Sequence, residues 1–126
     1  MGHSYAFEKL RVWKEAIELV KALYRILAGF PVEEQYNLAS QMKRAAISIS
    51  SNLAEGSTKA TDREKVRFYR ISYGSAIELL SQLILARGPG FIQQNDFIRI
   101  RDYIESITNK INALKIYTLR RNLQTI

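Results

Sequence analysis

The chain has 126 residues, a formal net charge of +7 and no cysteine. This is the size of one domain, and the lack of cysteine excludes disulfide bonds and thiolate metal sites. The N-terminal residues 1–6 lack the apolar region of a signal peptide, and no apolar run approaches the roughly 20 residues that span a bilayer, so we expect a cytoplasmic domain without membrane contact.

The first segment, from about residue 8 to 28, carries apolar residues at helical spacing. One stripe comprises Leu10, Trp13, Ile17, Val20, Tyr24 and Leu27, and a second comprises Val12, Ala16, Leu19, Leu23 and Ile26. Spacings of three and four are typical of an amphipathic helix. Gly29 and Pro31 end this helix, because Gly favours the C-cap and Pro cannot continue the hydrogen-bond ladder.

The second segment, from about residue 33 to 55, combines one apolar stripe with many small residues. The stripe comprises Leu38, Met42, Ala45, Ile49 and Leu53, and the small residues allow a neighbouring backbone to approach. Near its end, Asn52 and Glu55 lie on one helical face. We interpret them as a structural polar network, with an anchor for a ligand or a neighbouring chain as the alternative.

The third and fourth segments, about residues 62–87 and 96–120, are also predicted to be helices. Thr61 to Glu64 match a capping box, and Gly74 inside the third helix predicts a close helix crossing. The third helix carries two apolar stripes: Val66, Tyr69, Tyr73, Ile77, Leu80 and Ile84, then Phe68, Ser72, Ser75, Leu79, Leu83 and Ala86. The fourth carries Phe97, Ile100, Ile104, Ile107, Ile111 and Leu114, after a break at residues 88–90.

Four amphipathic helices with short connections predict an all-α, antiparallel up-down-up-down four-helix bundle over residues 1–126. The first and third helices are apolar over a wider face than one internal seam requires. Since large exposed apolar patches are uncommon on monomers, we expect a homo-oligomer. The predicted interface residues are Val12, Leu19, Leu23, Phe68 and Leu79.

Catalytic signals are weak. His3 is the only histidine, and the chain has neither a phosphate-binding loop nor the Glu-x-x-His motif of di-metal bundles. We therefore predict a protein that is not an enzyme and has no catalytic residue, metal or cofactor. Trp13 and Tyr24 are interpreted as core or interface anchors.

The basic residues indicate a polyanionic partner. Lys43, Arg44, Lys59, Arg63, Arg67 and Arg70 form the predicted nucleic-acid-binding set, and the last three share one helical face. Arg binds phosphate bidentately, so RNA or DNA is expected to bind through its backbone, without base-specific readout and with strong salt dependence. The main alternative is a structural or protein–protein interaction module whose charges form ion pairs on a solvated face. The third hypothesis is a helical bundle that binds a small molecule or is catalytic.

Several motifs point to one family. They are Phe7 to Leu10 with Val12-Trp13, Phe30-Pro31, Gln35-Tyr36, Leu38, Gln41, Arg44 to Ala46, Ser48-Ile49, Asn52 to Gly56, Gly74-Ser75 and Glu78-Leu79. In this order they resemble the four-helix-bundle proteins encoded in intervening sequences of 23S ribosomal RNA genes, and they are similar to the accessory variability protein of diversity-generating retroelements. The resemblance implies a bacterial or phage protein that forms a ring-like homopentamer with a basic, nucleic-acid-binding surface. The chain departs from the family at Ser50, where Pro is frequent, and in its Gly-rich turn at residues 88–90.

Overall fold

A computed structural model describes residues 2–124, with side chains as far as Arg121, and this part of the chain contains helices and no strand. Its elements in chain order are the 3-10 helix η1 (Ala6–Lys9), α1 (Arg11–Leu27), the single-turn α2 (Val32–Gln35), α3 (Leu38–Ser57), α4 (Asp62–Arg87) and α5 (Gln94–Gln124). The predicted all-α four-helix bundle is confirmed.

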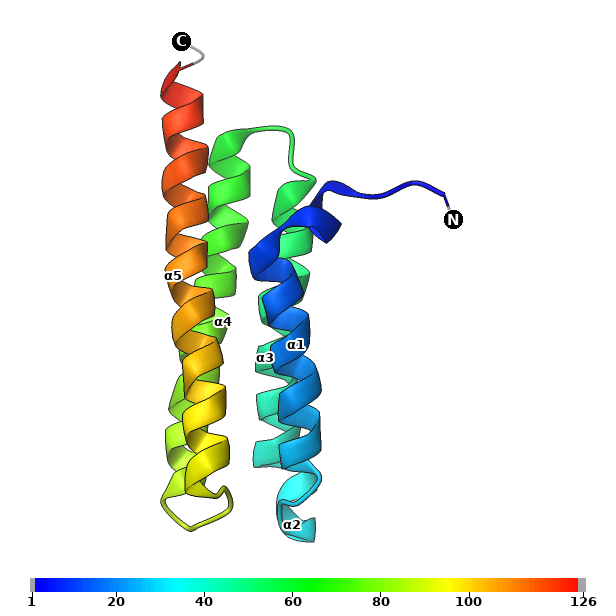
Figure 1. The fold of residues 1–126 in the computed structure, drawn as a ribbon, viewed down its shortest axis with the longest axis vertical. Helices are drawn as coiled ribbons and strands as arrows, with labels where there is room; N and C mark the ends of the chain where they lie inside the picture. Colours follow the sequence, from blue (N-terminus) through cyan, green and yellow to red (C-terminus); the bar gives the residue numbers. More distant parts are fainter. Residues whose placement is uncertain (1, 125–126) are drawn as a thin grey trace.

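The four long helices lie side by side, and consecutive ones run in opposite directions (Figure 1). Helix α1 packs against α3 and α5, and α4 packs against the same two helices. Both described chain ends therefore lie at one end of the bundle, and the α4–α5 turn lies at the other (Figure 1). We call these the terminal end and the turn end.

The first two predicted helices are each interrupted, and the other two are continuous. Leu10 is extended, with ψ of 122°, and separates η1 from α1. The Gln35 side chain donates hydrogen bonds to the carbonyls of Leu27 and Phe30, both at 3.0 Å. The Gln35 side chain thereby binds the carbonyl of the last residue of α1 and that of Phe30 in the connection, and ties α2 to both. Helix α4 begins at Asp62 as predicted, with the Thr61 hydroxyl accepting from the Glu64 amide at 3.1 Å.

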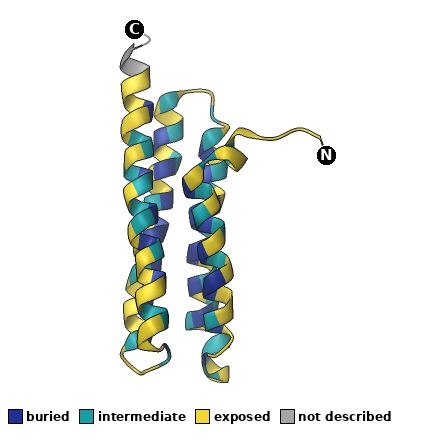
Figure 2. Ribbon diagram, viewed as in Figure 1, coloured by how far each residue is buried: buried dark blue, intermediate teal, exposed yellow. Residues whose placement is uncertain are grey.

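On α1 and α4 the core uses mainly the second apolar stripe of each helix, from which the interface residues were predicted. On α1, the buried residues include Val12, Ala16, Leu19 and Leu23, whereas Tyr24 is exposed. On α4, Leu79 and Leu83 are buried, but Ile77 and Ile84 are exposed. Each helix has two neighbours in the bundle, so the buried face is centred between them, as the dark stripes of Figure 2 show. The prediction that Val12, Leu19, Leu23 and Leu79 form an oligomer interface is therefore wrong, because these side chains are buried in the chain's own core.

The most extensive helix contact joins α3 and α4, and small residues make it possible. A Cβ added at Gly56 would lie 2.9 Å from both Phe68 Cβ and Tyr69 Cε1. The buried Ser72 hydroxyl donates to the Ile49 carbonyl at 2.8 Å. Gly74, in contrast, has nothing within 4 Å of its added Cβ, so the close crossing predicted there is wrong and occurs at Gly56 instead.

Two glycine substitutions should therefore change stability in opposite directions. Gly56→Ala places a methyl group against Phe68 and Tyr69 and should lower the free energy of unfolding by about 1–3 kcal/mol. Gly74→Ala fills open space in a helix and should raise it by about 1 kcal/mol. Urea denaturation at one fixed protein concentration measures both, and the same sign for the two variants would contradict this account of the α3–α4 contact.

Candidate nucleic-acid interface

The positive charge is concentrated in one half of the bundle. Two interhelical hydrogen bonds, Ser48 to Ser75 and Ser106 to Glu15, join the helix pairs α3–α4 and α5–α1 and lie near mid-length. We call residues 2–16, 49–74 and 107–121, at the terminal end, the basic half, and residues 17–48 and 75–106 the neutral half. The basic half has twelve Lys and Arg side chains and five Asp and Glu side chains, whereas the neutral half has seven of each kind. The basic half therefore holds the whole formal net charge of +7.

The structure separates the predicted nucleic-acid-binding residues into two groups. Lys59, Arg63, Arg67 and Arg70 lie together in the basic half, at the α3–α4 connection and on the first turns of α4. Lys43 and Arg44 belong to the neutral half of α3. The Lys43 ammonium lies 5.1 Å from the centre of the Tyr24 ring, and Arg44 lines a groove that also contains Glu78. These two residues are therefore not part of one surface with the other four.

Three arginines on α4 are the most available of these cations. Arg63, Arg67 and Arg70 are all exposed, and none of them forms an ion pair with a residue that the structure describes. Their positions repeat at i, i+4 and i+7, so they form one exposed row along the helix. The alternative prediction, a solvated face whose charges form ion pairs, therefore does not describe this row, which can contact phosphates without first losing a carboxylate partner.

Other cations of the basic half are held by nearby groups. Lys59 lies 3.7 Å from the Glu55 carboxylate, and Lys110 lies 3.0 Å from that of Glu15. Arg121 forms an ion pair with Asp62 and donates a hydrogen bond to its carboxylate. This hydrogen bond raises the pKa of the Arg121 guanidinium. These contacts fix the positions of side chains without neutralising the half as a whole.

The chain fold adds cations that were not in the predicted set. Lys65 on α4 joins Lys115, Arg120 and Arg121 on α5, about fifty residues further along the chain. The basic character of the last predicted helical turns is visible in the sequence. The antiparallel packing of α4 and α5 brings these α5 cations to the same end of the bundle as the α4 arginines (Figure 1). The sequence alone does not show this.

Phe68, the remaining predicted interface residue, is partly buried in the basic half. The Lys59 ammonium and the Arg67 guanidinium lie 4.8 and 5.6 Å from the centre of its ring. Such cation–π contacts are favourable and leave Phe68 surrounded by charge. It is therefore a poor centre for an apolar interface between copies of the chain.

The predicted polar network exists around Asn52 but does not include Glu55. The Asn52 amide donates to the Ser48 carbonyl at 2.8 Å and to its hydroxyl at 3.0 Å, and that hydroxyl is 2.8 Å from the Ser75 hydroxyl. The network therefore joins α3 to α4. Glu55 lies outside it, because its exposed carboxylate points to Lys59 instead.

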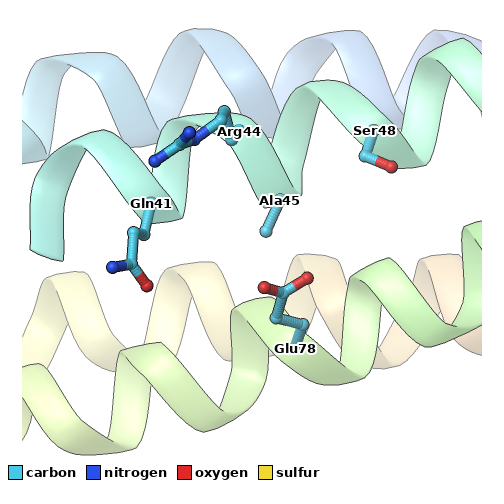
Figure 3. A pocket seen from close by; sticks show the side chains of 5 residues that line it. All are labelled: Gln41, Arg44, Ala45, Ser48 and Glu78. Atoms are coloured by element: carbon cyan, nitrogen blue, oxygen red, sulfur yellow. The ribbon is translucent and has the colours of Figure 1, made fainter.

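A groove of about 410 Å³ lies beside this network between α3 and α4. Gln41, Arg44, Ala45, Ser48 and Glu78 line it, and Figure 3 shows Gln41 of α3 and Glu78 of α4 pointing into the space between the two helices. The groove contains one cation, Arg44, and one carboxylate, Glu78. The Glu78 carboxylate repels phosphate and offsets the attraction by Arg44. The groove is therefore a weaker polyanion site than the row of arginines on α4.

Two further features bear on the class of site. The described residues contain no group of three or more His, Cys, Asp or Glu side chains placed to hold a metal ion. Within residues 2–124, every helix is too short or too polar to span a lipid bilayer.

Comparison with known proteins agrees with the resemblance found in the sequence. A model of the 23S rRNA-intervening sequence protein family matches residues 8–113. Among solved structures, the fold is similar to that of a protein with unknown function from the S23 ribosomal protein family of Bacteroides thetaiotaomicron. The two chains are 19% identical, with a TM-score of 0.75 over 82% of this chain and 97% of that chain, so the likeness shows the fold alone. No curated protein is significantly similar to this chain.

A double-mutant cycle should distinguish the real polar network from the predicted one. Ser48→Ala and Ser75→Ala remove one interhelical hydrogen bond, so their coupling energy should be about 1 kcal/mol. The matched cycle of Asn52→Ala with Glu55→Ala should give coupling within about 0.5 kcal/mol of zero, because these two side chains do not bind each other. Chemical denaturation of the six variants measures both, and stronger coupling of Asn52 with Glu55 would restore the original interpretation.

Proposed function

Because the chain belongs to the 23S rRNA-intervening sequence protein family, we propose that it is a non-enzymatic homo-oligomer that binds the phosphate backbone of RNA or DNA. The observation that carries this proposal is the placement of the entire net charge in one half of the bundle. A half with seven more cations than anions attracts polyanions over several ångströms. We also propose that the protein acts in the bacterial cytoplasm, because nucleic acid is found there.

The exposed row Arg63, Arg67 and Arg70 is the proposed primary contact. A guanidinium group can bind two phosphate oxygens at once. Among the described residues, no carboxylate forms an ion pair with this row that a phosphate would have to displace. Contacts of this kind position a nucleic acid but do not read its sequence. We therefore propose binding without base-specific readout.

Self-association is proposed to use the neutral half. Apolar side chains of α4 and α5 that remain exposed there include Ile77, Ile84 and Ile98. Ile77 and Leu80 also line a groove of about 190 Å³ between the two helices. A second copy of the chain is the partner that fits, because a half with seven cations and seven anions does not repel its own copies. For the number of copies we propose five, the number that the family resemblance implies.

Removing the α4 arginine row should weaken nucleic-acid binding specifically. The triple variant Arg63→Ala, Arg67→Ala, Arg70→Ala should lower affinity for duplex DNA and RNA. Each lost phosphate contact contributes about 0.9 to the slope of log affinity against log salt, so this slope should become shallower by about 2–3. Fluorescence anisotropy across a salt series measures both quantities.

The matched control is Arg25→Ala, Arg44→Ala, Arg99→Ala, which removes the same charge from exposed positions in the neutral half that do not line the groove with Ile77 and Leu80. It should change affinity much less. Equal losses for both triple variants would show that only net charge matters and would reject the basic half as the site. If the wild-type protein binds neither RNA nor DNA at low salt, the nucleic-acid role is rejected and the protein-interaction alternative remains.

Charge placed in the proposed interface should dissociate the oligomer. Ile84→Glu in the neutral half should give a smaller species by light scattering, because a carboxylate is costly to bury in an apolar contact. Ile116→Glu is the control, since Ile84 and Ile116 are 51% and 50% exposed but Ile116 lies in the basic half. A monomeric wild-type protein, or dissociation by Ile116→Glu alone, would contradict the proposal.

A further inference from the structure

A small recess opens in the basic half where the N-terminal segment, the end of α3, the start of α4 and the end of α5 meet. Its volume is about 160 Å³, below the roughly 300–1,000 Å³ of pockets that hold drug-sized molecules. Leu10, Leu114 and Tyr117 form apolar and aromatic walls, and Lys65, Tyr69 and Arg121 add polar groups. The recess therefore suits one planar ring system with an anionic group beside it.

Tyr69 supplies a polar group with no partner. Its side chain is only 3% exposed, it lines the recess, and its hydroxyl makes no hydrogen bond to any residue that the structure describes. Burial raises the pKa of this hydroxyl above its ordinary value, so near neutral pH it is a neutral donor and acceptor. Among the described residues, the only fully buried polar side-chain atom without a partner is Gln82 Oε1. The Tyr69 hydroxyl therefore reaches solvent through the recess, where the polar edge of a ligand can take the place of water.

Two cations are held beside this hydroxyl. The Lys65 ammonium donates to the Ser57 carbonyl at 2.9 Å, which uses one of its three donors. Arg121 is held by its ion pair with Asp62. Both side chains are thus positioned in advance at the recess, and each keeps donors for a phosphate oxygen.

Tyr117 provides a stacking surface. Its ring is 62% exposed, and the Arg121 guanidinium lies 5.8 Å from the ring centre. An exposed aromatic ring among cations is the arrangement with which proteins stack the bases of single strands. In a duplex, the bases are already stacked and paired, so their faces are not available to this ring.

We propose that the recess holds one unstacked base of a single-stranded nucleic acid. The base lies against Tyr117 and the leucine walls, its edge bonds to the Tyr69 hydroxyl, and an adjacent phosphate contacts Lys65 and Arg121. This inference rests on the proposed function, and it adds that single strands bind more tightly than duplexes.

Substitution of Tyr117 tests the recess without disturbing the core, because the side chain is largely exposed. Tyr117→Ala should lower affinity for a short single-stranded RNA roughly ten- to a hundredfold, as expected for the loss of one stacked base. Affinity for the same strand in a duplex should change by less than about twofold. Tyr36→Ala is the matched control, since Tyr36 is 94% exposed but lies in the neutral half, and it should change neither affinity.

Tyr69→Phe and two further ligands complete the experiment. Tyr69→Phe keeps the ring and removes only the hydroxyl, so it should weaken single-strand binding several-fold while circular dichroism shows an unchanged fold. An abasic single strand should bind wild type and Tyr117→Ala equally. Uridine monophosphate should bind far more weakly than the strand; comparable affinity would identify free nucleotides as the ligand and overturn the single-strand proposal.

The outcomes separate this inference from the proposed function. If wild type binds nucleic acid and the α4 arginine variant weakens it, but Tyr117→Ala affects single strand and duplex alike or not at all, the recess proposal is overturned and the backbone interface stands. If wild type binds no strand of either kind, both are overturned.

Discussion

The close contact between α3 and α4 is the constraint on which the rest of the structure depends. Gly56 lets Phe68 and Tyr69 approach the α3 backbone, and serine hydroxyls from α4 bind α3 at two levels. This contact fixes the rotation of α4 about its own axis. Because α4 cannot rotate, its arginine row faces outward and Tyr69 faces the recess at the terminal end. A packing interaction among small residues thereby determines the orientation of both proposed binding features.

Net charge divides the bundle along its length. The basic half would repel identical copies of itself, whereas the neutral half carries balanced charges and exposed isoleucines on α4 and α5. In the proposed ring of copies, rotational symmetry would place the basic halves of all subunits equivalently about one axis. Such an arrangement increases the local density of positive charge without burying it, and this is favourable for binding a long polyanion.

The sequence predicted much of the fold and part of the site. Helix α4 starts at Asp62 because Thr61 caps it, and such local chemistry is readable from neighbouring residues. The interface prediction failed for Val12, Leu19, Leu23 and Leu79, because periodicity gives the width of an apolar face but not its rotation toward two neighbours. Gly74 was misinterpreted for a related reason, since a glycine in a helix reveals nothing about what lies opposite it. Asn52 and Glu55 share a helical face, yet their partners lie in different places.

The sequence by itself determined the four helices, the net charge, the absence of thiol chemistry and the family, since all of these depend on composition, local spacing or ordered motifs. Only the tertiary structure decided that Lys43 and Arg44 lie apart from the α4 arginines, and that Lys65, Tyr69, Tyr117 and Arg121 meet at one recess. The physical reason is that antiparallel packing brings the start of α4 beside the end of α5. No pattern within either helix encodes which side chains of the other will face it.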